Sequence, residues 1–279
     1  MKIEKIVSIV TANLSEEFPG IEVKNTDVVK NGRTLTGILA KPSDSNIGPT
    51  AYINDLEGTD EEIAERITEI LRDAVRDLDS KTEGVMDVVE KSRDWEFAKT
   101  RIRSMLIKTE GNEKFLENRP HVEFLDLSKC FELVIDEARG MIAQINNDMM
   151  DRWGITAEDL EKAEQMPDVI FQSMAEIFGI PEMENTTPLY VLTNGRKFKG
   201  ASLITRENVL KDVSERVGGD FVLLPSSIHE VIIVPIDQCM GKMDEFTEMV
   251  KFVNNNEVDP TERLSDHAYL YTNGALQIA

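Results

Sequence analysis

The sequence predicts an α+β protein with two lobes, each an antiparallel sheet covered by helices. Asn-Gly dipeptides at residues 31–32 and 194–195 each separate two β-like segments, as hairpin turns of type I′ require. Elsewhere apolar residues recur at spacings of three and four, which indicates amphipathic helices. These segments do not alternate as βαβ units, so antiparallel sheets are favoured. The polar, aperiodic stretch 182–188 predicts a boundary between lobes 1–183 and 184–279.

Helices of the first lobe are predicted from periodicity and from capping residues. Thr59 and Glu62 form a capping box ahead of an apolar-striped segment, Asp94 is placed to cap a helix over residues 95–108, and Gly179 is placed to end a helix over 169–178. The remaining predicted helices cover residues 3–18 and 85–91, a segment capped by Asn146 that ends at Gly154, and a segment capped by Thr156.

Strands of the first lobe are predicted from short β-branched runs bounded by turn residues. They form a hairpin (residues 21–29 and 33–41), a short strand (49–53), and a three-stranded meander (122–127, 130–135 and 141–145) with turns at 128–129 and 136–140. Residues 111–120 are expected to be irregular.

The second lobe is predicted as hairpin, helix, hairpin, helix and strand. Its first hairpin joins residues 189–193 to 199–204 through Asn194-Gly195, and Thr205 is expected to cap the following helix, which Gly218-Gly219 ends. A second hairpin pairs the buried runs 221–224 and 231–234 around a polar loop. Residues 246–253 predict the last amphipathic helix, and residues 268–271 the last strand.

Composition narrows the possible partners. The 279 residues carry 52 acids against 31 bases, a formal charge of −21, and no cluster of basic residues breaks this excess. Nucleic acids and anionic membranes are therefore disfavoured as partners. The charge is expected mainly to keep the protein soluble, and the alternative is attraction to a basic protein partner.

Cysteine usage and hydropathy predict a cytoplasmic protein. Cys130 and Cys239 are the only cysteines, which excludes a disulfide scaffold, and both are expected to be small buried hydrophobes. The N-terminal apolar run is too short for a signal peptide, and no stretch approaches the roughly 20 apolar residues that span a bilayer. No cofactor is predicted.

The polar loop between the buried runs is the first candidate site. It contains Ser226, Ser227, His229 and Glu230, which could supply a nucleophile, a general base and an orienting carboxylate. Adjacent residues of one loop rarely form such a triad, and no Gly-x-Ser-x-Gly motif is present. The favoured interpretation is that the hydroxyls cap loop amides while the imidazole donates to a carbonyl.

Three other groups of residues are candidate binding sites. His121, His229 and His267 each have a carboxylate nearby in sequence, but their spacing matches no zinc motif. The basic segment 194–200, Asn-Gly-Arg-Lys-Phe-Lys-Gly, could hold an anion, although a solvated hairpin tip is favoured. Asp148, Asp151, Glu158 and Asp159 could bind a cation, but they lack the order of an EF-hand loop, and acids suit helix N-termini.

Several blocks of the sequence resemble an uncharacterised bacterial family, a domain of unknown function found mainly in gut anaerobes. They lie at residues 49–53, 119–121, 126–127, 147–156, 190–194 and 224–230, and Pro-Ser-Ser-Ile-His-Glu at 225–230 is the most specific of them. The resemblance implies a stand-alone intracellular protein and carries over no catalytic residue.

These observations lead to two functional hypotheses. The first is a non-enzymatic intracellular interaction or accessory protein, because no complete catalytic constellation is visible in a chain with a well-specified core. The alternative is a hydrolase that uses His229 as acid or base, assisted by Ser226, Ser227 or Glu230.

Overall fold

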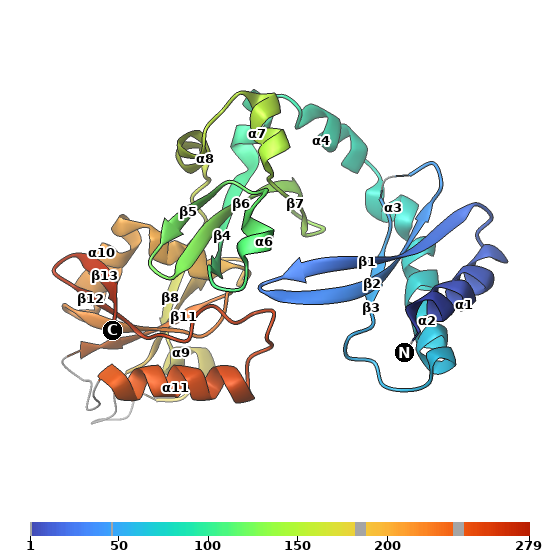
Figure 1. Cartoon of the computed structure of the whole chain (residues 1–279). Coiled ribbons are helices and arrows are strands. Elements are labelled where there is room, and N and C mark those ends of the chain that lie inside the picture. Colours follow the sequence, from blue (N-terminus) through green and yellow to red (C-terminus); the bar gives the residue numbers. More distant parts are fainter. Residues whose placement is uncertain (1, 46, 182–187, 237–242) are drawn as a thin grey trace. The chain divides into compact units, whose positions relative to one another are not determined.

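A computed structural model describes residues 2–45, 47–181, 188–236 and 243–279 (Figure 1). The chain divides into two compact units, Met1–Glu90 and Lys91–Ala279, and each is an α+β structure. The predicted lobe boundary at 183 and 184 lies outside the described residues. The strands on either side of it, β8 (Val169–Ser173) and β9 (Tyr190–Asn194), pair with each other inside the second unit.

The first unit is a three-stranded antiparallel sheet with helices against it, as predicted. Its sheet has the order β1-β2-β3, and Asn31 and Gly32 at the hairpin turn have φ values of 45° and 78°. The Thr59–Glu62 capping box is confirmed at the start of α2. The elements are α1 (Ile3–Ser15), β1 (Ile21–Lys30), β2 (Arg33–Pro42), β3 (Thr50–Tyr52), α2 (Asp60–Arg76), α3 (Leu78–Thr82) and α4 (Val85–Lys91).

The core of the first unit lies between α1, α2 and the sheet. One face of α1 buries Ile6, Val10 and Leu14 against Ile67 and Leu71 of α2, and strand residues complete the cluster. This stripe of apolar residues at spacings of three and four is why the periodicity predicted both helices.

The second unit contains two antiparallel sheets. The smaller is built around β6 (Leu127–Asp136), which pairs with β4 (Ile102–Lys108) along one edge. Along its other edge, β6 pairs first with β5 (His121–Phe124) and then, from Glu132 onward, with β7 (Met141–Gln144), with a register shift between Val134 and Asp136 inside this second pairing. The three predicted strands are present and pair in sequence, but β5 and β7 share one edge of β6 instead of flanking it as in a meander, and β4 takes the other edge.

The larger sheet has six strands in the order β13-β12-β10-β11-β9-β8. The predicted hairpin is confirmed as β10 (Phe221–Pro225) and β11 (Val231–Pro235), which lie at its centre. Phe221 and Leu223 pack in one cluster with α10 (Glu207–Val217), and Val222 and Leu224 pack in another with α11 (Met243–Asn256). Because helices cover both faces, the central strands are continuously apolar rather than alternating.

Several local predictions for the second unit are wrong. Residues 102–108 form β4 instead of a helix: Ser104 to Ile107 are all buried, and an apolar run buried on both faces has no strand-like alternation. Residues 169–178 are strand β8 followed by helix α9 (Met174–Phe178), because Ser173 forms a capping box with Glu176. The meander turn lies at residues 125–126 instead of 128–129, since Phe124 pairs with Leu127.

The predicted hairpin at 189–204 is wrong in its second half. Strand β9 is present, but residues 200–205 form a buried 3₁₀ helix, η2 (Gly200–Thr205), instead of a strand. Thr205 donates its hydroxyl to the Ser202 carbonyl and does not cap α10, whose N-cap is Arg206. A final hairpin, β12 (Tyr269–Thr272) and β13 (Ala275–Ile278), was predicted only as one strand.

The remaining helices of the second unit are short. These short helices are α5 (Trp95–Ala98), η1 (Lys99–Arg101), α6 (Glu113–Leu116), α7 (Asn147–Trp153) and α8 (Ala157–Ala163). Asn146 caps α7 and Thr156 caps α8, as predicted. Within the described parts of the chain, no helix combines the length and apolar character needed to cross a bilayer.

Candidate functional site

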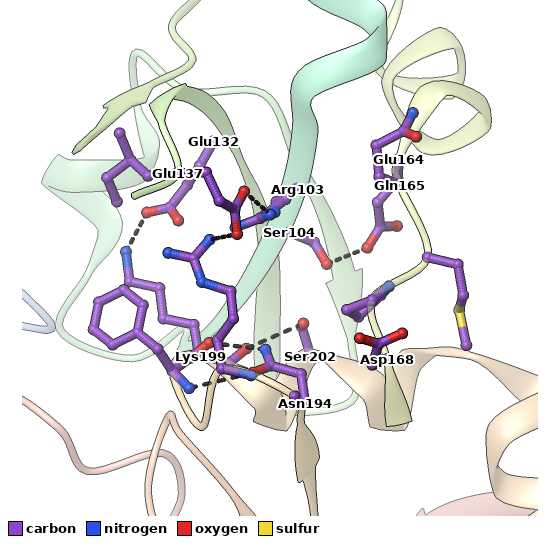
Figure 2. A pocket seen from close by; sticks show the side chains of 16 residues that line it. Arg103, Ser104, Glu132, Glu137, Glu164, Gln165, Asp168, Asn194, Lys199 and Ser202 are labelled. Atoms are coloured by element: carbon purple, nitrogen blue, oxygen red, sulfur yellow. Dashed lines mark hydrogen bonds and ion pairs between the residues drawn. The ribbon is translucent and has the colours of Figure 1, made fainter. Parts of the chain in front are cut away.

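A pocket of about 340 Å³ opens in the second unit where its two sheets meet (Figure 2). Strands β4 and β6, the turn after β6, the segment 164–168 before β8 and the loop after β9 contribute its walls. Charged side chains dominate this lining: the cations Arg103, Arg196 and Lys199, and the acids Glu132, Glu137, Glu164 and Asp168. Such a lining suits a polar ligand.

The first buried charge pair in this wall joins Glu132 of β6 to Lys199. Glu132 is 3% exposed, and its carboxylate accepts hydrogen bonds from Lys199 Nζ and Gln144 Nε2. A buried carboxylate without partners would cost several kcal/mol, so both side chains are fixed in place by each other.

A second buried carboxylate, Glu164, lies across the pocket. Its side chain is 4% exposed and pairs with Lys129 Nζ at 2.7 Å and Arg206 Nη2 at 2.8 Å. Ser104 of β4 also donates its hydroxyl to Glu164 Oε1. Lys129 Nζ also lies 3.5 Å from Glu161 Oε1, so two cations and two carboxylates balance behind this wall.

The third ionic group is more exposed. Glu137, in the turn between β6 and β7, accepts from Arg103 on one carboxylate oxygen and from Arg196 Nη1, at 2.8 Å, on the other. The Glu137 side chain is 55% exposed, and the two arginine side chains are about one third exposed. This group therefore faces solvent at the mouth of the pocket.

The loop after β9 is organised by Asn194. Its side-chain oxygen accepts from the amides of Arg196 and Phe198, and its Nδ2 donates to the Phe198 carbonyl at 2.8 Å. Asn is suited to this because its short amide can replace backbone partners in a turn. The basic segment is exposed at residues 195–198, as expected of a solvated tip, and it also contributes to the pocket wall.

The same loop has strained backbone. Lys197 and Lys199 have φ values of 52° and 55°, which non-glycine residues adopt rarely. Gly200 follows, and a Cβ atom there would lie 2.4 Å from Thr193 Oγ1 and 2.7 Å from the His229 carbonyl oxygen. Strain of this kind persists only where surrounding contacts impose it, and it concentrates at binding and active sites.

His229 makes contacts that hold the loop after β9 in this conformation. Its Nδ1 accepts from the Lys199 amide at 3.1 Å, and its carbonyl accepts from the Gly200 amide and the Thr193 hydroxyl. Because Nδ1 is an acceptor, the ring proton lies on Nε2, which is 3.3 Å from Glu262 Oε1. The Phe198 ring packs beside the imidazole. His229 thus holds the pocket loop from behind, and it is not among the residues that line the pocket.

The rest of the polar loop caps itself. The hydroxyls of Ser226 and Ser227 donate to Glu230 Oε1, at 3.3 and 3.1 Å, and Ser227 Oγ accepts from the His229 amide. Neither hydroxyl bonds to the imidazole. The predicted capping of a loop amide agrees with the contacts of Ser227, whereas the Ser226 hydroxyl donates to Glu230 instead of accepting from an amide. The imidazole accepts from an amide and does not donate to a carbonyl.

The other two histidines make separate contacts. His121 Nδ1 lies 2.8 Å from the Arg119 carbonyl, and His267 Nδ1 lies 3.0 Å from Asp126 Oδ2. No three His, Cys, Asp or Glu side chains within the described residues are arranged to hold a metal ion.

Two of the four acidic candidates on α7 and α8, Glu158 and Asp159, have structural partners. Asp159 closes the capping box of α8, and hydrogen bonds from the Thr156 amide and hydroxyl lower the pKa of its carboxyl. Glu158 pairs with Lys162 at 2.7 Å, and Asp148 lies in the first turn of α7. Burial raises the pKa of the Cys130 thiol to about 12, as expected for an inert buried cysteine. Cys239 lies outside the described residues.

A half-buried carboxylate at the β5–β6 turn ties this sheet to the larger one. Asp126 accepts from the Tyr269 and Ser265 hydroxyls, at 2.6 and 2.7 Å, as well as from His267. Burial acts to raise the pKa of this carboxyl, but the three side-chain hydrogen bonds together outweigh it and lower the pKa below its usual value. Burial and the nearby carboxylate raise the pKa of the Tyr269 hydroxyl.

Asp126→Asn is expected to lower the free energy of unfolding at pH 7 by about 2 kcal/mol, because an amide cannot accept all three bonds. A carboxyl whose pKa is lowered on folding stabilises the fold above its unfolded pKa, about 3.9, and this stabilisation is lost as pH falls through the folded pKa. Urea unfolding measured at pH 7, 5 and 3 should therefore show that the difference in free energy of unfolding between wild type and variant is smallest at pH 3. Asp148→Asn is the exposed control, and a difference independent of pH would contradict the assignment.

Sequence reasoning missed most of the pocket. Arg103 was placed on a helix, and Glu164 was placed inside the helix capped by Thr156, which in the structure ends at Ala163. One signal was present: Glu132 interrupts an otherwise apolar strand, Cys-Phe-Glu-Leu-Val-Ile, and an acid there must find a buried partner.

Comparison with known proteins gives one family match. The model of DUF5688, described as a family of unknown function, matches residues 3–273. No curated protein and no solved structure matches this chain.

Proposed function

The chain belongs to DUF5688, a family of unknown function, and we propose from its own geometry that it is a non-enzymatic accessory protein that binds a small polar ligand. The ligand occupies the pocket of the second unit. We place the protein in the cytoplasm, in keeping with its two cysteines and the burial of Cys130.

The observation that carries this proposal is the rigid charged wall. The pocket volume of about 340 Å³ falls in the range of small-molecule sites, roughly 300–1,000 Å³. Buried, paired charges and a strained loop hold its polar groups in fixed positions before any ligand arrives. Such preorganisation lowers the cost of ordering the site on binding.

The pocket also offers one carboxylate that a ligand can use directly. Asp168 is exposed in the pocket lining beside Gly195, and its side chain makes no hydrogen bond or ion pair with the described residues. It suits a hydroxyl, amine or amide of the ligand, because an ionised carboxylate is a strong acceptor.

The hydrolase alternative receives less support from the contacts. A nucleophilic serine needs a base within hydrogen-bond reach, whereas both Ser226 and Ser227 donate to Glu230. Both ring nitrogens of His229 are also engaged, with the Lys199 amide and with Glu262.

A thermal-shift screen of polar metabolites against the full-length protein tests the proposed function. A ligand at 100 times its Kd should stabilise the fold by about 2.7 kcal/mol, which raises the melting temperature by several degrees. Asp168→Asn should weaken that ligand about tenfold or more without changing the melting temperature of the free protein. The matched control is Asp148→Asn, on α7. A screen without any ligand whose effect depends on Asp168 would overturn the proposal, as would turnover abolished by Ser227→Ala.

A further inference from the structure

We propose that Arg103 and Arg196 form an oxyanion-binding clamp, and that Glu137 occupies it as an internal substitute until a ligand carboxylate or phosphate displaces it. The inference rests on the proposed function and names the anionic group of the ligand. Each oxygen of the Glu137 carboxylate takes one guanidinium, from two elements far apart in sequence. A free oxyanion at the same point would find the same donors.

Glu137 is held much less tightly than the other acids of the pocket. Glu132 and Glu164 have side chains that are 4% exposed, and breaking such pairs costs several kcal/mol. The Glu137 side chain is 55% exposed, and surface ion pairs of this kind contribute little to stability. A ligand anion therefore competes with a weak internal contact, while the rest of the wall stays in place.

The turn that carries Glu137 does not depend on this contact. Asp136 accepts from the Arg139 amide and pairs with the Arg139 guanidinium, and the Gly140 amide donates to the Glu137 carbonyl. Gly140 has a φ of 66°, which closes the turn without strain. The Glu137 side chain can consequently rotate into solvent while its backbone remains fixed.

The two arginines are well placed for a bound anion. Arg103 lies on β4 and Arg196 on the loop that Asn194 organises, so both backbones are fixed. Figure 2 shows Arg103 beside Glu137, and Arg196 Nη1 lies 2.8 Å from Glu137 Oε1. Guanidinium groups bind carboxylate and phosphate through paired hydrogen bonds. Asp168 lines the same pocket, so the best ligand combines an oxyanion with a hydrogen-bond donor.

Displacement of Glu137 also enlarges the site. A second hollow of about 260 Å³ shares Arg103, Glu137 and Gln165 with the pocket. The Arg103–Glu137 pair is thus part of the wall common to both hollows. Rotation of Glu137 would join them and admit a longer ligand.

The test is a titration of the ¹⁵N-labelled full-length protein with inorganic phosphate and, separately, with acetate, at constant ionic strength. Glu137→Gln should tighten binding about fivefold to tenfold, with shifts at the amides of the loop after β9. Glu248→Gln is the matched control, because Glu248 also forms an exposed pair, with Lys251 on α11, and its loss changes the net charge equally. Adding Arg196→Gln to Glu137→Gln should abolish the gain.

Every outcome bears on the clamp. Equal affinities in wild type, Glu137→Gln and Glu248→Gln would overturn it, as would a gain that survives Arg196→Gln or the absence of saturable binding by either anion. In those cases an Asp168-dependent metabolite would still support the proposed function. Tighter binding of phosphate than of acetate would identify a phosphate ester as the anionic group of the ligand. Tighter binding of acetate would identify a carboxylate.

Discussion

Lys199→Met is expected to lower the free energy of unfolding by about 4 kcal/mol, because it leaves the Glu132 carboxylate buried without its cation. The side chains have similar length, so the loss reports charge and hydrogen bonding more than packing. Denaturant unfolding of the full-length protein measures it. The control is Lys162→Met, which removes an exposed partner of Glu158 and should leave the free energy of unfolding almost unchanged.

The double variant Glu132→Leu/Lys199→Met sharpens this prediction. Replacing both members of a buried ion pair by apolar groups is often close to neutral, so the double variant should recover much of the lost stability. If Lys199→Met instead costs no more than Lys162→Met, the pair is not buried in solution and the rigid wall of the pocket is wrong.

Gly200→Ala is expected to cost about 3 kcal/mol, because the added Cβ would meet the Thr193 hydroxyl and two backbone atoms within 2.7 Å. The loop would have to withdraw from His229, and this would also displace Lys199 from Glu132. Melting temperature and ligand affinity should fall together. Gly195→Ala is a control for stability in the same loop, since the nearest atoms to its Cβ belong to the Asp168 side chain, at 3.1 Å. Its melting temperature should change little, and an equal fall in melting temperature in both variants would argue against close packing on His229.

Features set by neighbouring residues were predictable from the sequence. The Asn31-Gly32 turn, the capping box of α2 and the caps of α7 and α8 all depend on contacts within a few residues. The predicted α+β class is also confirmed, because it depends on the repeated order of hairpins and helices.

Features set by distant residues were not predictable in this way. The Asn194-Gly195 dipeptide suggested a hairpin, but Gly200 packs on the His229 carbonyl and η2 forms in place of the second strand. Likewise, β4 takes its conformation from pairing with β6, about thirty residues later. The pocket is lined by segments of both kinds. The charged residues in its wall can therefore be recognised as neighbours only from the strand pairing in the structure.

Contacts of His229 link two segments that are far apart in the sequence, the polar loop 225–230 and the basic segment 194–200. The His229 ring and carbonyl serve the amides of Lys199 and Gly200, so neither block can change alone without leaving a backbone group unsatisfied. The two blocks are therefore expected to covary among relatives. Relatives that replace His229 should also have a changed segment 194–200, and relatives that keep His229 should keep that segment.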